Sequence, residues 1–198
     1  MAVMTIAGAW PDVWPHEDRP LTVADMERMP DDGNRYELDE GMLIVSPAPF
    51  NNHQVVVTRL AVLLHLACPG EFIVLAGPGV NLSDMQHRVP DIAVVQAAAF
   101  KADYVFEDRP PILAVEVASR STARYDRTRK KAVYEQYGVQ SYWIVTPDLA
   151  KPAIVSCELA GGRFTDAGRA SGDELFEAAR PFPVSFTPAS LLTAGPLR

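Results

Sequence analysis

Two short apolar runs, each carrying one acid, decide the fold: VPDIAVV at residues 89–95 and PILAVEVAS at residues 111–119. Both are rich in apolar and β-branched residues and are bounded by turn-forming residues, so we expect strands at 91–95 and 112–117. Neither run alternates apolar with polar residues, which predicts central strands buried on both faces. Their acids, Asp91 and Glu116, are therefore the first residues that need an explanation.

Strand-like and helix-like segments alternate around this centre, which predicts an α/β or α+β layer fold. The longest helix is expected to start at Asn51 or Asn52, because apolar residues from Val56 to Ala67 recur at helical spacing before Pro69 and Gly70. A second helix is expected at 124–137, ended by Gly138. The remaining expected elements are a short helix at 22–29, a hairpin at 36–38 and 42–46, strands at 72–75, 141–145 and 153–158, and a hairpin around 161–162.

Length and composition are those of an ordinary globular protein: 198 residues, of which 48% are hydrophobic and 22% charged. We expect residues 1–20 to form a loose leader and residues 21–198 to form a single domain. The two cysteines, Cys68 and Cys157, form no CxxC pair, which argues against a structural zinc site and favours a reducing compartment. No apolar run is long enough to span a membrane, and the first 20 residues lack the basic n-region of a secretory signal, so we expect a cytoplasmic protein.

The net charge of −7 argues against nonspecific nucleic-acid binding by the protein as a whole. The segment RSTARYDRTRKK at 120–131 differs, because it carries six basic residues and a single acid. This segment is either a solvated helix face or a local patch that binds phosphate. The sequence alone leaves both interpretations open.

Several common catalytic motifs are absent, including GxxxxGK[ST], GxSxG and HExxH. An acid in a buried strand costs several kcal/mol unless it is paired or bound to a metal. Glu116 could form a salt bridge with a nearby arginine, and Asp91 could simply cap the start of a strand. If the two carboxylates instead converge at one end of the sheet, they form an oxygen-rich site suited to Mg²⁺ or Mn²⁺.

The chain carries an ordered set of motifs that closely resembles the Uma-two family of restriction-endonuclease-like proteins. The resemblance covers roughly residues 20–193. The motifs are RYELDEGMLIVSPAP at 35–49, His53, PDIAVV at 90–95, EVASRST at 116–122, and the series Asp126, Lys130, Tyr134, Gly138, Val139 and YWIV at 142–145.

This resemblance implies the PD-(D/E)xK nuclease fold, a mixed central sheet flanked by helices, with a site that cleaves phosphodiesters with the help of Mg²⁺ or Mn²⁺. Asp91 and Glu116 match the two metal-binding acids, and Val117 would add its backbone carbonyl. Glu37 matches the acid of the first motif. The pattern departs at Ala118, where a lysine is expected, and Lys130 is the matching family lysine on the following helix.

The favoured hypothesis is accordingly a metal-dependent endonuclease in which Glu37, Asp91, Glu116 and Lys130 are catalytic and DNA is the substrate. We expect Arg120, Arg124, Arg127, Arg129 and Tyr134 to contact the nucleic acid. His53 could line the site or serve a local hydrogen bond, and a homodimer is plausible. The alternatives are a nuclease-fold module that binds nucleic acid or protein without cutting, and a metal-dependent enzyme acting on a small phosphorylated molecule.

Overall fold

The computed structural model describes residues 19–30, 32–46, 49–100, 106–107, 109–118, 123–193 and 195. The expected leader at 1–20 therefore lies outside the described residues except for residues 19 and 20. Arg120, one of the residues expected to contact DNA, also lies outside them. Among the described helices, none combines the length and apolar character that a membrane span requires.

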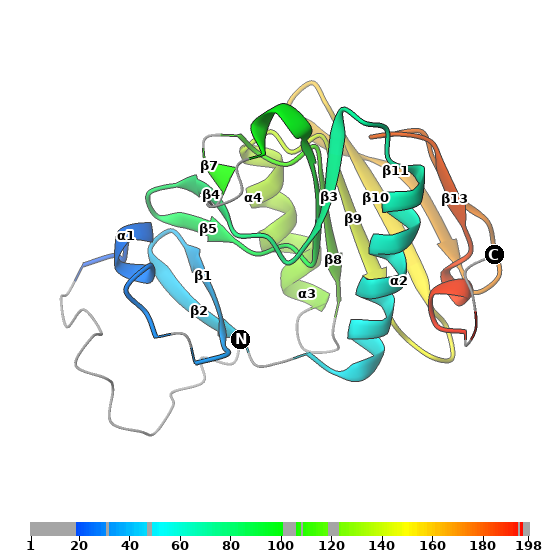
Figure 1. The fold of residues 1–198 in the computed structure, drawn as a ribbon, viewed down its shortest axis with the longest axis horizontal. Helices are drawn as coiled ribbons and strands as arrows, with labels where there is room; N and C mark the ends of the chain where they lie inside the picture. The colour runs from blue at the N-terminus through cyan, green and yellow to red at the C-terminus, as the bar shows by residue number, and fades with distance from the viewer. Residues whose placement is uncertain are drawn as a thin grey trace.

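A six-stranded mixed sheet forms the centre of the fold (Figure 1). Its third and fourth strands run parallel and all other neighbours run antiparallel. The apolar run at 111–119 supplies β8, whose five residues are all buried, and the run at 89–95 supplies its neighbour β6. In sheet order the strands are β11 (Arg163–Ser171), β10 (Ala153–Ala160), β9 (Ser141–Thr146), β8 (Leu113–Val117), β6 (Ile92–Gln96) and β3 (Phe72–Ala76).

Helices cover both faces of this sheet (Figure 1). The helix α2 (Asn51–Ala67) packs its buried apolar residues on one face, against side chains of β6, β8 and β9. On the opposite face, α3 (Ala123–Tyr125), a π-helical segment (Asp126–Lys130) and α4 (Lys131–Gln136) run on from one another. The helix expected at 124–137 is thus present, but its middle is wound as a π-helix.

A second sheet of five short strands lies beside the first (Figure 1). The predicted hairpin supplies its edge, while the other three strands were not expected from the sequence because they are only two to four residues long. In sheet order the strands are β2 (Met42–Ser46), β1 (Arg35–Asp39), β5 (Gln86–Arg88), β4 (Val80–Ser83) and β7 (Phe106–Glu107). The remaining elements are α1 (Val23–Met26), η1 (Ala97–Ala99), β12 (Phe176–Ala178), β13 (Val184–Phe186) and η3 (Pro188–Leu191).

The turn between β1 and β2 fixes which side chains of β1 face the site. Glu40 and Gly41 form a two-residue connection and both have positive φ, at 52° and 77°, as a type I′ hairpin turn requires. A Cβ at Gly41 would also lie 2.4 Å from Pro20 Cβ, so the position demands glycine. With the register set, alternation along the strand places Arg35, Glu37 and Asp39 on one face.

Candidate active site

Asp91 lies at the start of β6 and is held in place from three directions. One carboxylate oxygen, Oδ1, accepts a hydrogen bond from Arg35 Nη1 at 2.9 Å. The other, Oδ2, accepts the backbone N–H of Val117 at 2.7 Å and lies 3.1 Å from His53 Nε2. Asp91 is therefore more than a strand cap, because it joins β1, β8 and the first turn of α2.

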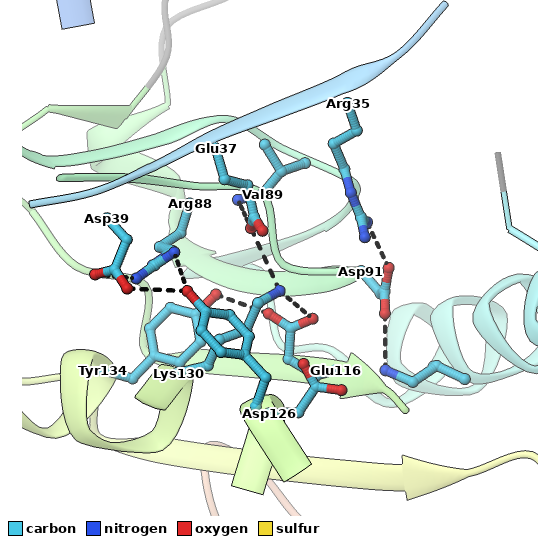
Figure 2. A network of polar contacts seen from close by, with 12 residues as sticks. Arg35, Glu37, Asp39, Arg88, Val89, Asp91, Glu116, Asp126, Lys130 and Tyr134 are labelled. Carbon is cyan, nitrogen blue, oxygen red and sulfur yellow. Dashed lines mark hydrogen bonds and ion pairs between the residues drawn. The ribbon is translucent and has the colours of Figure 1, made fainter. Parts of the chain in front are cut away.

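Glu116 points to the face of β8 that the π-helical segment covers. Lys130 Nζ lies 2.9 Å from Glu116 Oε2, and the hydroxyl of Tyr134 donates to Glu116 Oε1 at 3.0 Å (Figure 2). The same ammonium lies 3.3 Å from Glu37 Oε1, which also accepts the backbone N–H of Val89 at 2.9 Å. The partner of Glu116 is thus a lysine, and not one of the nearby arginines.

Ala118 occupies the position at which the nuclease motif has a lysine. Its side chain is buried with Tyr134 and Tyr142 in a small apolar cluster on the α4 face of the sheet. A cation nevertheless reaches Glu116, because Lys130 approaches from the helix that covers this face. The structure therefore brings Glu37, Glu116 and Lys130 together.

Burial and charge shift the acids of the site in opposite directions. Burial raises the pKa of Glu116, and the neighbouring carboxylates of Asp91 and Glu37 add to this rise against the attraction of Lys130. Burial acts on Asp91 in the same sense, but His53, Arg35 and the N–H of Val117 outweigh it and lower its pKa. Glu37 also has a lowered pKa, because the cations of Lys130 and Arg88 outweigh its burial. Burial and the two neighbouring carboxylates thus raise the pKa of Glu116, while the pKa values of Asp91 and Glu37 are lowered.

The donor set suits a divalent ion only if solvent or substrate completes the coordination. Within the described residues, no three His, Cys, Asp or Glu side chains form a group that could hold a metal. Asp91 and Glu116 supply two carboxylates. The backbone of Val117 lies beside them, because its N–H donates to Asp91 Oδ2. Mg²⁺ is commonly bound through one or two carboxylates together with waters and phosphate oxygens, so these residues fit it.

The residues expected to contact DNA differ in their exposure and in their partners within the protein. Arg124 and Arg127 are exposed on the π-helical side of the site. Tyr134 is fully buried, so base stacking is the wrong interpretation for it, and its role is the hydrogen bond to Glu116. Arg129 is likewise engaged within the protein, with Asp39 and Glu40.

Sequence reasoning missed a second polar cluster, which adjoins the site through β1. Arg88 is completely buried and lies 2.8 Å from Asp39 Oδ1. Arg129 donates to both oxygens of Asp39, with its shortest bond at 2.7 Å, and Tyr125 adds its hydroxyl at 3.0 Å. The alternation of side chains along β1 could have indicated this cluster, because residues two apart in a strand lie on the same face and Asp39 therefore faces the same way as Glu37.

We expect the stability of the protein to depend on pH because of His87, which precedes Arg88 on β5. It is buried, its Nδ1 lies 2.6 Å from Asn81 Oδ1, and burial lowers its pKa from the ordinary 6.5 to about 4, with help from Arg88. The unfolded chain binds a proton below pH 6.5 while the folded state does not until about pH 4. The free energy of unfolding should therefore fall by about 2–3 kcal/mol between these two pH values.

Urea unfolding of the wild type and His87→Gln at several pH values from 7 to 4 measures this effect. The difference in the free energy of unfolding between the wild type and His87→Gln should change by about 2–3 kcal/mol between pH 6.5 and pH 4, because the variant lacks the titrating group. The matched control is His65→Gln, since His65 is exposed on α2 and should follow the wild-type curve. Parallel curves for the wild type and His87→Gln would contradict the prediction.

A mixed sheet whose neighbouring strands bring an aspartate and a glutamate together, with a lysine on the covering helix, defines a restriction-endonuclease-like fold. The chain matches the Uma2 family, described as "putative restriction endonuclease", over residues 23–191, and it belongs to that family. Its structure is similar to the crystal structure of a "putative nuclease belonging to DUF820" from Anabaena variabilis ATCC 29413. The two share 17% identity and a TM-score of 0.61, over 78% of this chain and 86% of the other. No curated protein matches the chain.

Proposed function

We propose that this protein is a metal-dependent endonuclease that hydrolyses phosphodiester bonds of DNA. Membership of the Uma2 family supports a nuclease function in general terms, and nucleases with this fold typically use divalent metals. The observation that supports the proposal is the position of Asp91 beside Val117, the residue that follows Glu116 on β8, with the buried Lys130 against Glu116. Asp91 Oδ2 accepts the N–H of Val117 at 2.7 Å, and Lys130 Nζ lies 2.9 Å from Glu116 Oε2.

Asp91, Glu116 and the carbonyl of Val117 would hold Mg²⁺ or Mn²⁺. When bound, the ion would polarise the scissile phosphate and lower the pKa of a coordinated water. Asp91 needs little rearrangement for this task, since the N–H of Val117 and the ring of His53 already fix its orientation. Glu116 would have to share its oxygens between the ion and its present partners, Lys130 and Tyr134.

Lys130 would stabilise the negative charge that develops on the phosphate during attack by water. Its ammonium is held by two carboxylates, and Glu116, Glu37 and Asp126 raise its pKa despite burial. The lysine therefore stays protonated at neutral pH. Glu37 would act through Lys130, because Glu37 Oε1 lies 3.3 Å from the ammonium.

DNA would approach along the side of the site where Arg124 and Arg127 are exposed. Arginines at such positions contact phosphates and orient a duplex without reading its bases. The rest of the chain is acidic, so binding should depend on this local patch and weaken with added salt.

Incubation of supercoiled plasmid with purified protein at low salt tests the proposal directly. We expect nicking with Mg²⁺ or Mn²⁺ and none with EDTA. Asp91→Asn should reduce nicking to background, because the neutral amide is a poor metal ligand. Glu177→Gln removes an exposed acid on β12 and is the matched control, with wild-type nicking expected.

Nicking that persists in Asp91→Asn would come from a contaminating nuclease and would remove the support for the proposal. If the wild type binds Mn²⁺ in calorimetry but leaves plasmid, linear duplex and single strands intact, the nuclease proposal is wrong. A binding module with the same fold would then be the better explanation.

A further inference from the structure

We propose that Arg35 is a ligand for the substrate phosphate and that, before the metal binds, it occupies the oxygen of Asp91 that the metal needs. Metal binding and DNA binding would then be coupled through one guanidinium group. This inference rests on the proposed nuclease function and adds to it a residue for which the family motifs imply no role.

The contacts of Asp91 leave one oxygen for the metal. Oδ2 already receives the N–H of Val117 and faces His53, so a cation has to approach Oδ1. Among the described residues, Arg35 is the donor to Oδ1, at 2.9 Å. A guanidinium at that distance competes for the lone pairs and repels a divalent ion through its charge.

Arg35 can leave this position far more easily than Lys130, the other cation of the site. The side chain of Arg35 is 33% exposed, whereas that of Lys130 is 5% exposed and held between Glu37 and Glu116. Figure 2 shows the two cations reaching the acids from different elements, Arg35 from β1 and Lys130 from the helix. Displacement of Arg35 therefore moves a charge toward solvent and leaves the buried network intact.

A phosphate group is the natural new partner for the displaced guanidinium. Arginine binds phosphate through two parallel hydrogen bonds, and these charge-assisted bonds are stronger than neutral ones. A phosphate bound beside Asp91 would draw Arg35 away from Oδ1 and so favour the metal. By linkage, the metal must favour phosphate binding by the same factor.

Calorimetry with Mn²⁺ alone, without DNA, tests the competition. We expect Arg35→Gln to bind Mn²⁺ about tenfold more tightly than the wild type, because the competing charge is gone. Arg35→Lys keeps the charge and should stay within about threefold of the wild type. The matched control is Arg169→Gln, which removes an exposed arginine on β11 and should not change the affinity. Thermal unfolding of each variant checks that it folds.

Binding of a 20-base-pair duplex in Ca²⁺, with its integrity checked on a gel, tests the coupling. The wild type should bind Ca²⁺ about tenfold more tightly with the duplex present, and Arg35→Gln should lose this coupling and bind the duplex about fivefold more weakly. If Arg35→Gln binds Mn²⁺ no better than the wild type while the wild type cuts plasmid, this inference is wrong and the proposed function stands. If the wild type binds no divalent ion, both are wrong.

Discussion

Lys130→Met is expected to lower the rate of plasmid nicking at saturating Mg²⁺ by about a hundredfold to a thousandfold, the range typical for loss of one preorganised charge-stabilising group. Lys130 is the buried cation that reaches both Glu116 and Glu37, at 2.9 and 3.3 Å. Methionine has a similar length and fills much of the same volume. The substitution therefore removes the charge while it largely preserves the packing.

Lys131→Met is the matched control, because it removes the same charge one residue along the helix. Lys131 is only half-buried, so nicking by this variant should stay within about threefold of the wild type. Lys130→Met leaves Glu37 and Glu116 without their shared cation, which costs stability. The double variant Glu37→Gln with Lys130→Met removes part of that cost, and it should recover stability without recovering nicking.

Metal affinity separates a catalytic role of Lys130 from a structural one. Loss of a positive charge next to Glu116 should leave Mn²⁺ binding unchanged or stronger, while the nicking rate falls. If Mn²⁺ binding is lost together with nicking, Lys130 only holds the acids in place. If Lys130→Met nicks at the wild-type rate, the assignment of Lys130 is wrong.

The buried centre of the fold was predictable because its signals are local. The apolar runs gave β6 and β8, the turn residues gave the β1–β2 hairpin, and helical spacing gave α2 at Asn51–Ala67. The sequence predicted a continuous helix at 124–137, yet residues 126–130 are π-helical. Within this segment Arg129 and Lys130 contact Asp39 and Glu37 of β1, and these are contacts that no local sequence pattern contains.

The residues of the candidate site also differ in whether the sequence could indicate them. Asp91, Glu116 and Lys130 belong to motifs in the chain, so their resemblance to a known family located them. Arg35 also lies in the first motif, but its contact with Asp91 joins residues 56 positions apart, and Arg88 meets Asp39 across about 50 residues of chain. A buried arginine such as Arg88 is rare, and sequence alone indicated neither its burial nor its partner.

Asp39→Ala is expected to lower the free energy of unfolding by about 3–5 kcal/mol, a large share of the stability of a typical domain. Asp39 faces Arg88, which is completely buried, and it also accepts hydrogen bonds from Arg129 and Tyr125. Removal of the carboxylate leaves the charge of Arg88 without its 2.8 Å partner inside the protein. Urea unfolding at pH 7 measures the loss.

Two further variants distinguish a buried charge from a general loss of contacts. Asp173→Ala removes an exposed acid and should change the stability by less than about 0.5 kcal/mol. Asp39→Leu with Arg88→Met replaces both charges by apolar groups and should be clearly more stable than Asp39→Ala, because no unpaired charge remains. If Asp39→Ala costs less than about 1 kcal/mol, Arg88 finds another partner and Asp39 does not anchor β1 to the helix. A large loss that the double variant does not reverse would instead mean that the network of Arg129 and Tyr125, and not the buried charge, carries the stability.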